Sequence, residues 1–188
     1  NKSNELIIIL RITSFKYDKA LLKTNLTQLI QSQGSQIQEF NFTENHIKLI
    51  ITNIKNIKTL AEQIKSIDNL EIDSIGSNSQ VIKDTGDAKD LDNKHHISQI
   101  SGSHGIGHVR LATESIVDVT HSHPFWAYPF PDVTVVHNGQ LTNYHSVKRD
   151  YEDSGHRFLT RNDSEVIAVY LADRLARGAT LRESLEDS

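Results

Sequence analysis

Four segments in the second half of this 188-residue chain carry side chains that can bind and activate a small molecule. In the first, residues 105–113 (G-I-G-H-V-R-L-A-T), Arg110 stands between the apolar residues Val109 and Leu111. A guanidinium in a partly buried place needs a carboxylate, which its planar fork binds with two hydrogen bonds. The sequence predicts such a partner for Arg110, either on a ligand or on an internal Asp or Glu.

The second segment concerns Asn138-Gly139, which follows the apolar residues 133–136. Asn-Gly is typical of a type I′ hairpin turn, which is the structural interpretation. No alternating strand follows, however, and residues 142–152 have a helical pattern that Gly155 ends. On a loop between a strand and a helix, an amide side chain and a backbone N–H can face one point and stabilise a developing oxyanion.

The third segment is Asp163-Ser164, which precedes apolar residues at helical spacing. Either residue can act as the N-cap of that helix, which Gly178 is expected to end. In the functional interpretation, a carboxylate at a helix N-terminus is positioned toward the ammonium group of a substrate.

The fourth segment contains His121 and His123, whose spacing is compatible with metal binding on a strand. Because no third ligand stands at motif spacing, we expect neither a metal site nor a cofactor. His108 and His156 are expected to be structural or surface histidines. The aromatic run at 125–130 is expected to pack in the interior or to form a loop wall.

In their order and spacing these segments resemble the class II (N-terminal-nucleophile) glutamine amidotransferase domain. The hallmarks of that domain are G-H-x-R-x-A-T, an A-H-P-like turn, H-N-G-x-L-x-N, and D-S-E before a helix, and all four occur in order within residues 105–188. The detailed sequences of these motifs are most similar to those of the separate amidotransferase subunits of glutamate-synthase-like systems.

The resemblance implies a glutamine-binding role for four positions. Arg110 would hold the α-carboxylate of glutamine and Asp163 its α-ammonium group. Thr113 and His123 fall where the family lines the glutamine pocket.

The resemblance also implies the chemistry. In the family an N-terminal cysteine attacks the side-chain amide carbon, a glutamyl thioester forms, ammonia passes to a synthase domain or subunit, and water releases glutamate. Asn138 and Gly139 would supply the oxyanion hole. For the most similar family members the ammonia acceptor would be 2-oxoglutarate or a similar oxo acid.

The chain has no cysteine, which excludes disulfides, zinc thiolates and a cysteine nucleophile within these residues. It also has no methionine. We therefore expect an internal segment of a longer polypeptide, with the nucleophile upstream of Asn1 and no activity in this segment alone. The alternative is a non-catalytic regulatory or scaffolding subunit that retains a glutamine-binding shell.

Charge and hydropathy exclude other function classes. The net charge of −4 gives no basic footprint for nucleic acid. No apolar run reaches the roughly 20 residues of a membrane helix, and no signal peptide is evident, so a cytoplasmic protein is expected. The expected partners are glutamine, a glutamate-synthase-like subunit and a second copy of the chain.

The elements that would position these residues give an α+β fold class with two parts. Residues 1–76 contain fifteen Ile and no Val, and their periodicity predicts a ferredoxin-like βαββαβ domain. Its expected strands and helices are 6–12, 22–30, 37–42, 47–54, 57–67 and 70–75.

Residues 77–104 are expected to be a linker, and residues 105–188 part of an αββα sandwich of the N-terminal-nucleophile hydrolase type, as the resemblance implies. Its expected elements are strands at 106–111, 116–120, 133–136 and 157–159 and helices at 143–152 and 164–177. Thr180 and Glu183 form a predicted capping box for a further helix, which the sequence cuts at Ser188.

In the first part, Ile7 and Ile9 alternate with Leu6, Ile8 and Leu10 and should face the side of the sheet that the helices leave open. An apolar open face usually meets a second copy or a neighbouring domain. Binding of a small effector there is the alternative.

Overall fold

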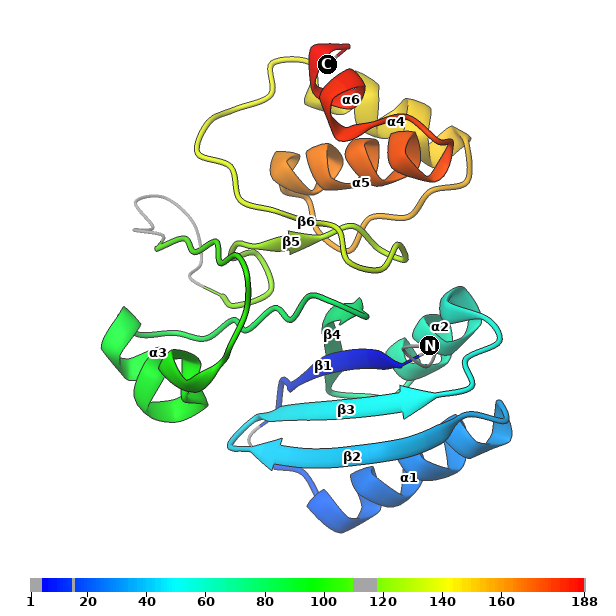
Figure 1. Cartoon of the computed structure of the whole chain (residues 1–188), viewed down its shortest axis with the longest axis vertical. Coiled ribbons are helices and arrows are strands. Elements are labelled where there is room, and N and C mark those ends of the chain that lie inside the picture. Colours follow the sequence, from blue (N-terminus) through cyan, green and yellow to red (C-terminus); the bar gives the residue numbers. More distant parts are fainter. Residues whose placement is uncertain (1–4, 15, 110–117, 188) are drawn as a thin grey trace. The chain divides into compact units, whose positions relative to one another are not determined.

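The computed structural model describes residues 5–14, 16–109 and 118–187. The chain divides into two compact units, Asn1–Ile82 and Lys83–Ser188, and each is described by itself. The fold is α+β with antiparallel sheets, as expected (Figure 1). Across the described ranges, every helix is too short or too polar to cross a bilayer.

The first unit has the element order predicted from its periodicity. All four strands and both helices are confirmed, with ends that differ by a few residues from those expected. The elements are β1 (Leu6–Ile12), α1 (Lys19–Ser32), β2 (Gln36–Thr43), β3 (His46–Thr52), α2 (Ile57–Lys65) and β4 (Leu70–Gly76).

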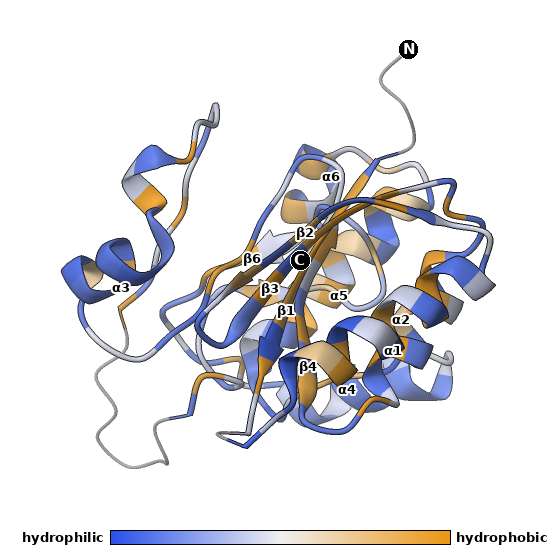
Figure 2. Ribbon diagram, turned by 90° about the horizontal axis from the view of Figure 1, so that it is seen from below, coloured by the Kyte–Doolittle hydropathy of each residue, from blue (hydrophilic) through white to orange (hydrophobic). Residues whose placement is uncertain are grey.

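The sheet of the first unit has the strand order β2-β3-β1-β4, and every neighbouring pair is antiparallel. Ile8 of the central strand pairs with Leu49 on one side and Ile75 on the other, and all three are fully buried. The two helices pack on β2, on β4 and on each other. Apolar colour therefore runs along the strands in Figure 2.

The strand face that carries Ile7 and Ile9 is not purely apolar. Ile9 is buried and Ile7 is half-buried, but Arg11 follows on the same face and is 5% exposed. Its Nε lies 3.3 Å from Oδ1 of Asp73, and a further nitrogen pairs with Glu71. Buried charges need such partners because isolated ions are strongly disfavoured away from water. The partner expected for this face stays a prediction.

In its described residues the second unit contains four α-helices, one single-turn 3-10 helix and one two-stranded sheet. Its elements are α3 (Ala88–His95), η1 (Ile97–Gln99), β5 (Phe125–Trp126), β6 (Thr134–Val135), α4 (Tyr144–Asp153), α5 (Asp163–Ala176) and α6 (Leu181–Glu186). Strands β5 and β6 pair antiparallel, and α5 packs against both. Ala127, Ala168 and Ala172 form the centre of this packing.

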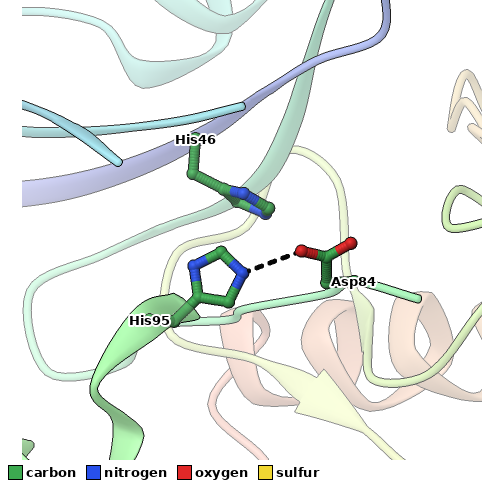
Figure 3. Close-up of side chains that lie close together, drawn as sticks. All are labelled: His46, Asp84 and His95. Atoms are coloured by element: carbon green, nitrogen blue, oxygen red, sulfur yellow. Dashed lines mark hydrogen bonds and ion pairs between the residues drawn. The ribbon is translucent and has the colours of Figure 1, made fainter. Parts of the chain in front are cut away.

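Helix α3 forms inside the stretch expected to be a linker. Asp87 and Asp90 make a reciprocal capping box at its start. At its end, Nε2 of His95 lies 3.0 Å from Oδ2 of Asp84, as Figure 3 shows. Burial alone would raise the pKa of Asp84, but the hydrogen bond from His95, the backbone N–H of Thr85 and the charge of Lys94 outweigh it and lower that pKa. Asp84 thus ties the end of α3 to the segment before it.

Most of the strands expected in the second part are absent from the described residues. The expected strand at 133–136 is confirmed as the short β6, and residues 157–159 form no strand. The strands expected at 106–111 and 116–120 lie partly outside the described residues, and their described parts, 106–109 and 118–120, form no strand. Ile106 and Val109 are 57% and 79% exposed, so no partner strand packs on them. A strand is stabilised mainly by its cross-strand neighbours, which local sequence does not report.

The helices of the second part agree better with the sequence. The expected helices at 143–152 and 164–177 are confirmed as α4 and α5, each displaced by about one residue. The capping box of Thr180 and Glu183 is also confirmed, and α6 ends at Glu186. The aromatic run is packed as expected: Phe125, Trp126 and Tyr128 are almost fully buried.

Candidate functional site

The N-terminus of α5 organises the candidate site. The helix begins at Asp163, and its N-cap is Asn162, whose side-chain oxygen accepts the N–H of Ser164 at 2.9 Å. The expectation that Asp163 or Ser164 is the N-cap was therefore wrong. Because Asn162 performs the capping, the side chains of Asp163 and Ser164 are available to contact other segments.

The hydroxyl of Ser164 joins two histidines from distant parts of the unit. Its Oγ lies 3.1 Å from Nε2 of His123 and 3.1 Å from Nδ1 of His137. It also lies 3.3 Å from Oδ1 of Asp163. Ser164 is only 2% exposed, so these contacts are made almost out of water. In this environment hydrogen bonds are strengthened and their geometry is well defined.

The carboxylate of Asp163 holds a second point of the same loop. Its Oδ2 accepts the backbone N–H of Leu141 at 2.8 Å. The loop of residues 137–141 is thus attached to the first two residues of α5 at both ends, through His137 and through Leu141. Asn138 and Gly139 lie between these attachments and are exposed.

The ring of His137 lies directly beside Gly139. A Cβ atom added to Gly139 would be 2.8 Å from Nε2 of His137 and 3.2 Å from its Cε1. These distances are shorter than van der Waals contact, so a side chain at position 139 would require the ring to move. Glycine at position 139 therefore allows this close approach of the His137 ring.

The turn that contains His123 is packed from two sides. The His123 ring lies 4.3 Å from the ring of His108 and 4.7 Å from that of Phe125, measured between centroids. His108, expected to be structural or on the surface, is half-buried against this ring. By contrast, Nδ1 of His121 lies 2.7 Å from Oδ2 of Asp118, so the two histidines considered for a metal have different hydrogen-bond partners.

Glu165, the next residue of α5, fixes the loop that leads into the helix. It is 1% exposed, and its carboxylate accepts the N–H of Leu159 at 2.6 Å and both the N–H and the hydroxyl of Thr160 at 2.7 Å. Burial raises the pKa of Glu165, although these hydrogen bonds oppose the increase. In the segment 157–159, which was expected to be a strand, the N–H of Leu159 thus donates to a side chain rather than to a neighbouring strand.

Four of the six residues assigned to the site from sequence are described. His123 and Asp163 contact Ser164 directly, and Asn138 and Gly139 lie on the loop that Asp163 and His137 hold. Their loop connects β6 to α4, which confirms the interpretation as a strand-to-helix loop rather than a hairpin turn. Arg110 and Thr113 lie outside the described residues.

The contacts of Ser164, His137 and Glu165 were not predicted from the sequence. Ser164 was considered only as a cap, and His137 only as part of the H-N-G motif. The available signal was the run of three polar residues, Asp163 to Glu165, at the start of an apolar helix. A helix start needs one capping side chain, which Asn162 supplies, so all three of these polar side chains were available for other contacts.

The segment that contains this cluster matches a known family. The sequence profile described as "Glutamine amidotransferase domain" matches residues 66–180, from the C-cap of α2 to the N-cap of α6. The chain belongs to this family. The resemblance drawn from the four motifs is thereby confirmed.

Several curated proteins are similar to this glutamine amidotransferase domain. A "Putative glutamine amidotransferase" of Methanothermobacter thermautotrophicus is 42% identical over 149 residues, which cover 77% of this chain and 49% of that protein. The "Glutamine amidotransferase-like protein GlxB" of Rhizobium meliloti is 38% identical over 117 residues, 62% of this chain and 38% of that protein. A chloroplastic amidophosphoribosyltransferase of Vigna aconitifolia is 36% identical over 102 residues, 54% of this chain and 21% of that protein. The chain thus spans about half or less of these relatives.

Proposed function

We propose that this chain is part of the glutaminase component of a class II glutamine amidotransferase, which hydrolyses glutamine to glutamate and passes ammonia to a partner synthase domain or subunit. The observation that carries the proposal is the hydrogen bond between Leu141 and Asp163. It brings the exposed Asn138-Gly139 loop and a carboxylate at a helix N-terminus to one place. The reacting side-chain amide of a bound glutamine would meet the oxyanion donors of the loop, and its α-ammonium group would meet the carboxylate.

The reaction requires a cysteine nucleophile outside these 188 residues, which contain none. Its sulfur would bond to the side-chain amide carbon of glutamine, and the carbonyl oxygen would become an oxyanion. The amide of Asn138 and the N–H of Gly139 would hold that oxyanion. Collapse of the intermediate breaks the C–N bond, ammonia leaves with a proton, and water then cleaves the glutamyl thioester to give glutamate.

Asp163 would bind the α-ammonium group of glutamine. A carboxylate has about four acceptor positions, and in the described residues Asp163 accepts hydrogen bonds from the N–H of Leu141 and the hydroxyl of Ser164. Acceptor capacity therefore remains for a substrate. Arg110 would bind the α-carboxylate, and Thr113 and His123 would line the pocket.

The same proposal includes the finer features of fold and assembly. The antiparallel order of the first unit supports a ferredoxin-like domain at 1–76, followed by a linker at 77–104. Residues 105–188 would complete part of an αββα sandwich. The proposal also includes a glutamate-synthase-like partner subunit and a 2-oxo acid as the ammonia acceptor. It further includes self-association of the chain and a cytoplasmic location.

The test is to measure glutamate release from glutamine by the full-length natural protein that carries this chain, with and without its synthase partner. Release that Asn138→Ala lowers by roughly 10²–10³ would support the proposal. An active full-length protein whose rate is unaffected by both Asn138→Ala and Asp163→Ala would contradict the assigned site.

The second candidate function is a non-catalytic subunit that binds glutamine. It would use the same site residues for binding and would need no cysteine nucleophile. Calorimetry with glutamine distinguishes the two functions. Heat of binding without any glutamate release would favour the binding subunit. A protein that shows no binding and no release would contradict both functions.

A further inference from the structure

We propose that Ser164 is the positioning residue of the 137–141 loop: its hydroxyl selects the tautomers of His137 and His123, and through the His137 ring it fixes the backbone of Gly139. This inference rests on the proposed function for its catalytic consequence. Its structural part is independent of any activity.

The hydroxyl of Ser164 carries a single proton, which limits it to one donated hydrogen bond. A serine hydroxyl donates one hydrogen bond and accepts two. An ionised carboxylate cannot donate, so in the contact between Ser164 and Asp163 the serine must be the donor. Its two lone pairs then face the two imidazoles, and both rings must donate to it. His137 therefore carries its proton on Nδ1, and His123 carries one on Nε2.

The hydrogen bond between Ser164 and His137 also affects Gly139. With Nδ1 of His137 bound to Ser164, the ring is held against position 139, where Nε2 would be only 2.8 Å from an added Cβ. Asp163 holds the far end of the loop through Leu141. Two adjacent side chains of one helix therefore set both ends of the segment that carries the proposed oxyanion donors.

The catalytic consequence is a change in kcat rather than in KM. Without the hydroxyl, the His137 ring loses its partner while the loop remains attached to Asp163. Glutamine binding through Asp163 should persist, but the Gly139 N–H should be less well aligned with the oxyanion. Loss of a whole oxyanion donor lowers kcat by about 10²–10³, so a misaligned donor should lower it by roughly tenfold.

The first experiment reads the tautomers directly in the full-length protein by long-range proton–nitrogen NMR of the imidazole rings. The expected result is a protonated Nδ1 in His137 and a protonated Nε2 in His123, and a changed pattern for both in Ser164→Ala. Ser164→Thr, which keeps the hydroxyl, should retain the original pattern. The matched control is Ser184→Ala, because Ser184 is also fully buried and its hydroxyl bonds to the Thr180 carbonyl at 2.8 Å in α6.

The second experiment is a double-mutant cycle between Ser164→Ala and Gly139→Ala, with kcat for glutamate release as the readout. Gly139→Ala should lower kcat strongly while the ring is held, and clearly less in the Ser164→Ala background, where the ring can move away. A merely structural effect of Ser164 would give losses that multiply independently. If the losses multiply, the inference is wrong.

The outcomes also separate this inference from the proposed function. A protein that shows the expected tautomers but releases no glutamate would overturn the proposed function and leave the structural role of Ser164 intact. An active glutaminase in which Ser164→Ala leaves both ring patterns and kcat like those of Ser184→Ala would overturn the role of Ser164 alone.

Discussion

The backbone N–H of Leu141 donates to Oδ2 of Asp163 over 2.8 Å, although the two residues are 22 positions apart in the chain. Asp163 was assigned from sequence to a substrate ammonium group, and in the structure it also anchors the loop that carries Asn138 and Gly139. Substitutions that separate these two roles are therefore informative.

Asp163→Asn should raise KM for glutamine with a smaller effect on kcat. The amide retains an oxygen that can accept the Leu141 N–H, but it lacks the charge that would pair with the ammonium group. A charge-assisted hydrogen bond contributes about 1.5–3 kcal/mol, which corresponds to roughly a 10- to 150-fold increase in KM. Steady-state kinetics of glutamate release would measure it. Asp163→Ala removes both roles and should in addition lower kcat; equal effects of the two variants would show that the charge, not the anchor, matters.

Asn138→Ala should lower kcat by roughly 10²–10³ with little change in KM, because an oxyanion donor acts mainly in the transition state. Gln140→Ala is the matched control, since Gln140 is an exposed amide residue of the same loop. Single-turnover measurements with glutamine would distinguish slow chemistry from slow product release. A small effect shared by both variants would indicate that Asn138 only shapes the loop.

Glu165→Gln should destabilise the second unit by about 1–3 kcal/mol, because the amide NH₂ would face a backbone N–H that now donates to a carboxylate oxygen. Chemical denaturation at neutral pH would measure the loss. The control is Gln140→Glu, which replaces an exposed amide with a carboxylate and should have almost no effect on the free energy of unfolding.

The pH dependence of stability should also reveal Glu165. Its pKa is raised in the folded state, so the folded protein binds more protons than the unfolded chain between the ordinary pKa of 4.5 and the raised value. The contribution of Glu165 to stability therefore falls as pH rises through that window. Denaturation at a series of pH values should show this decrease in the native protein and not in Glu165→Gln; identical slopes would contradict the assignment.

Asp84→Asn should loosen the end of α3. The pKa of Asp84 is lowered in the folded state, so its stabilising contribution is present above the ordinary value of 3.8 and is lost as pH falls through the lowered value. The effect should be about 0.5–1.5 kcal/mol, the net contribution of one such hydrogen bond. Hydrogen exchange of the α3 amides at neutral pH would detect it. Asp153→Asn, which removes an equal but exposed charge from the end of α4, should leave those amides unchanged.

Local patterns predicted the elements whose stability is mainly local or depends on one apolar face. Leu22, Leu26 and Ile30 recur on one face of α1 and are buried there, and Gly34 follows the helix end with a φ of 78°. The same holds for the capping box at Thr180, in which both partners lie within one turn. Short strands were predicted less well, because a run such as 157–159 forms a strand only if another strand pairs with it.

The sequence by itself determined the family, the order of elements in the first unit and the residue types proposed to bind glutamine, because ordered motifs and apolar periodicity are properties of neighbouring residues. Only the tertiary structure decided that Asn162 caps α5 and that Ser164 contacts His137 and His123, which are 27 and 41 positions away. A hydrogen bond over such a separation leaves no local pattern, since it depends on how the loops and α5 pack together.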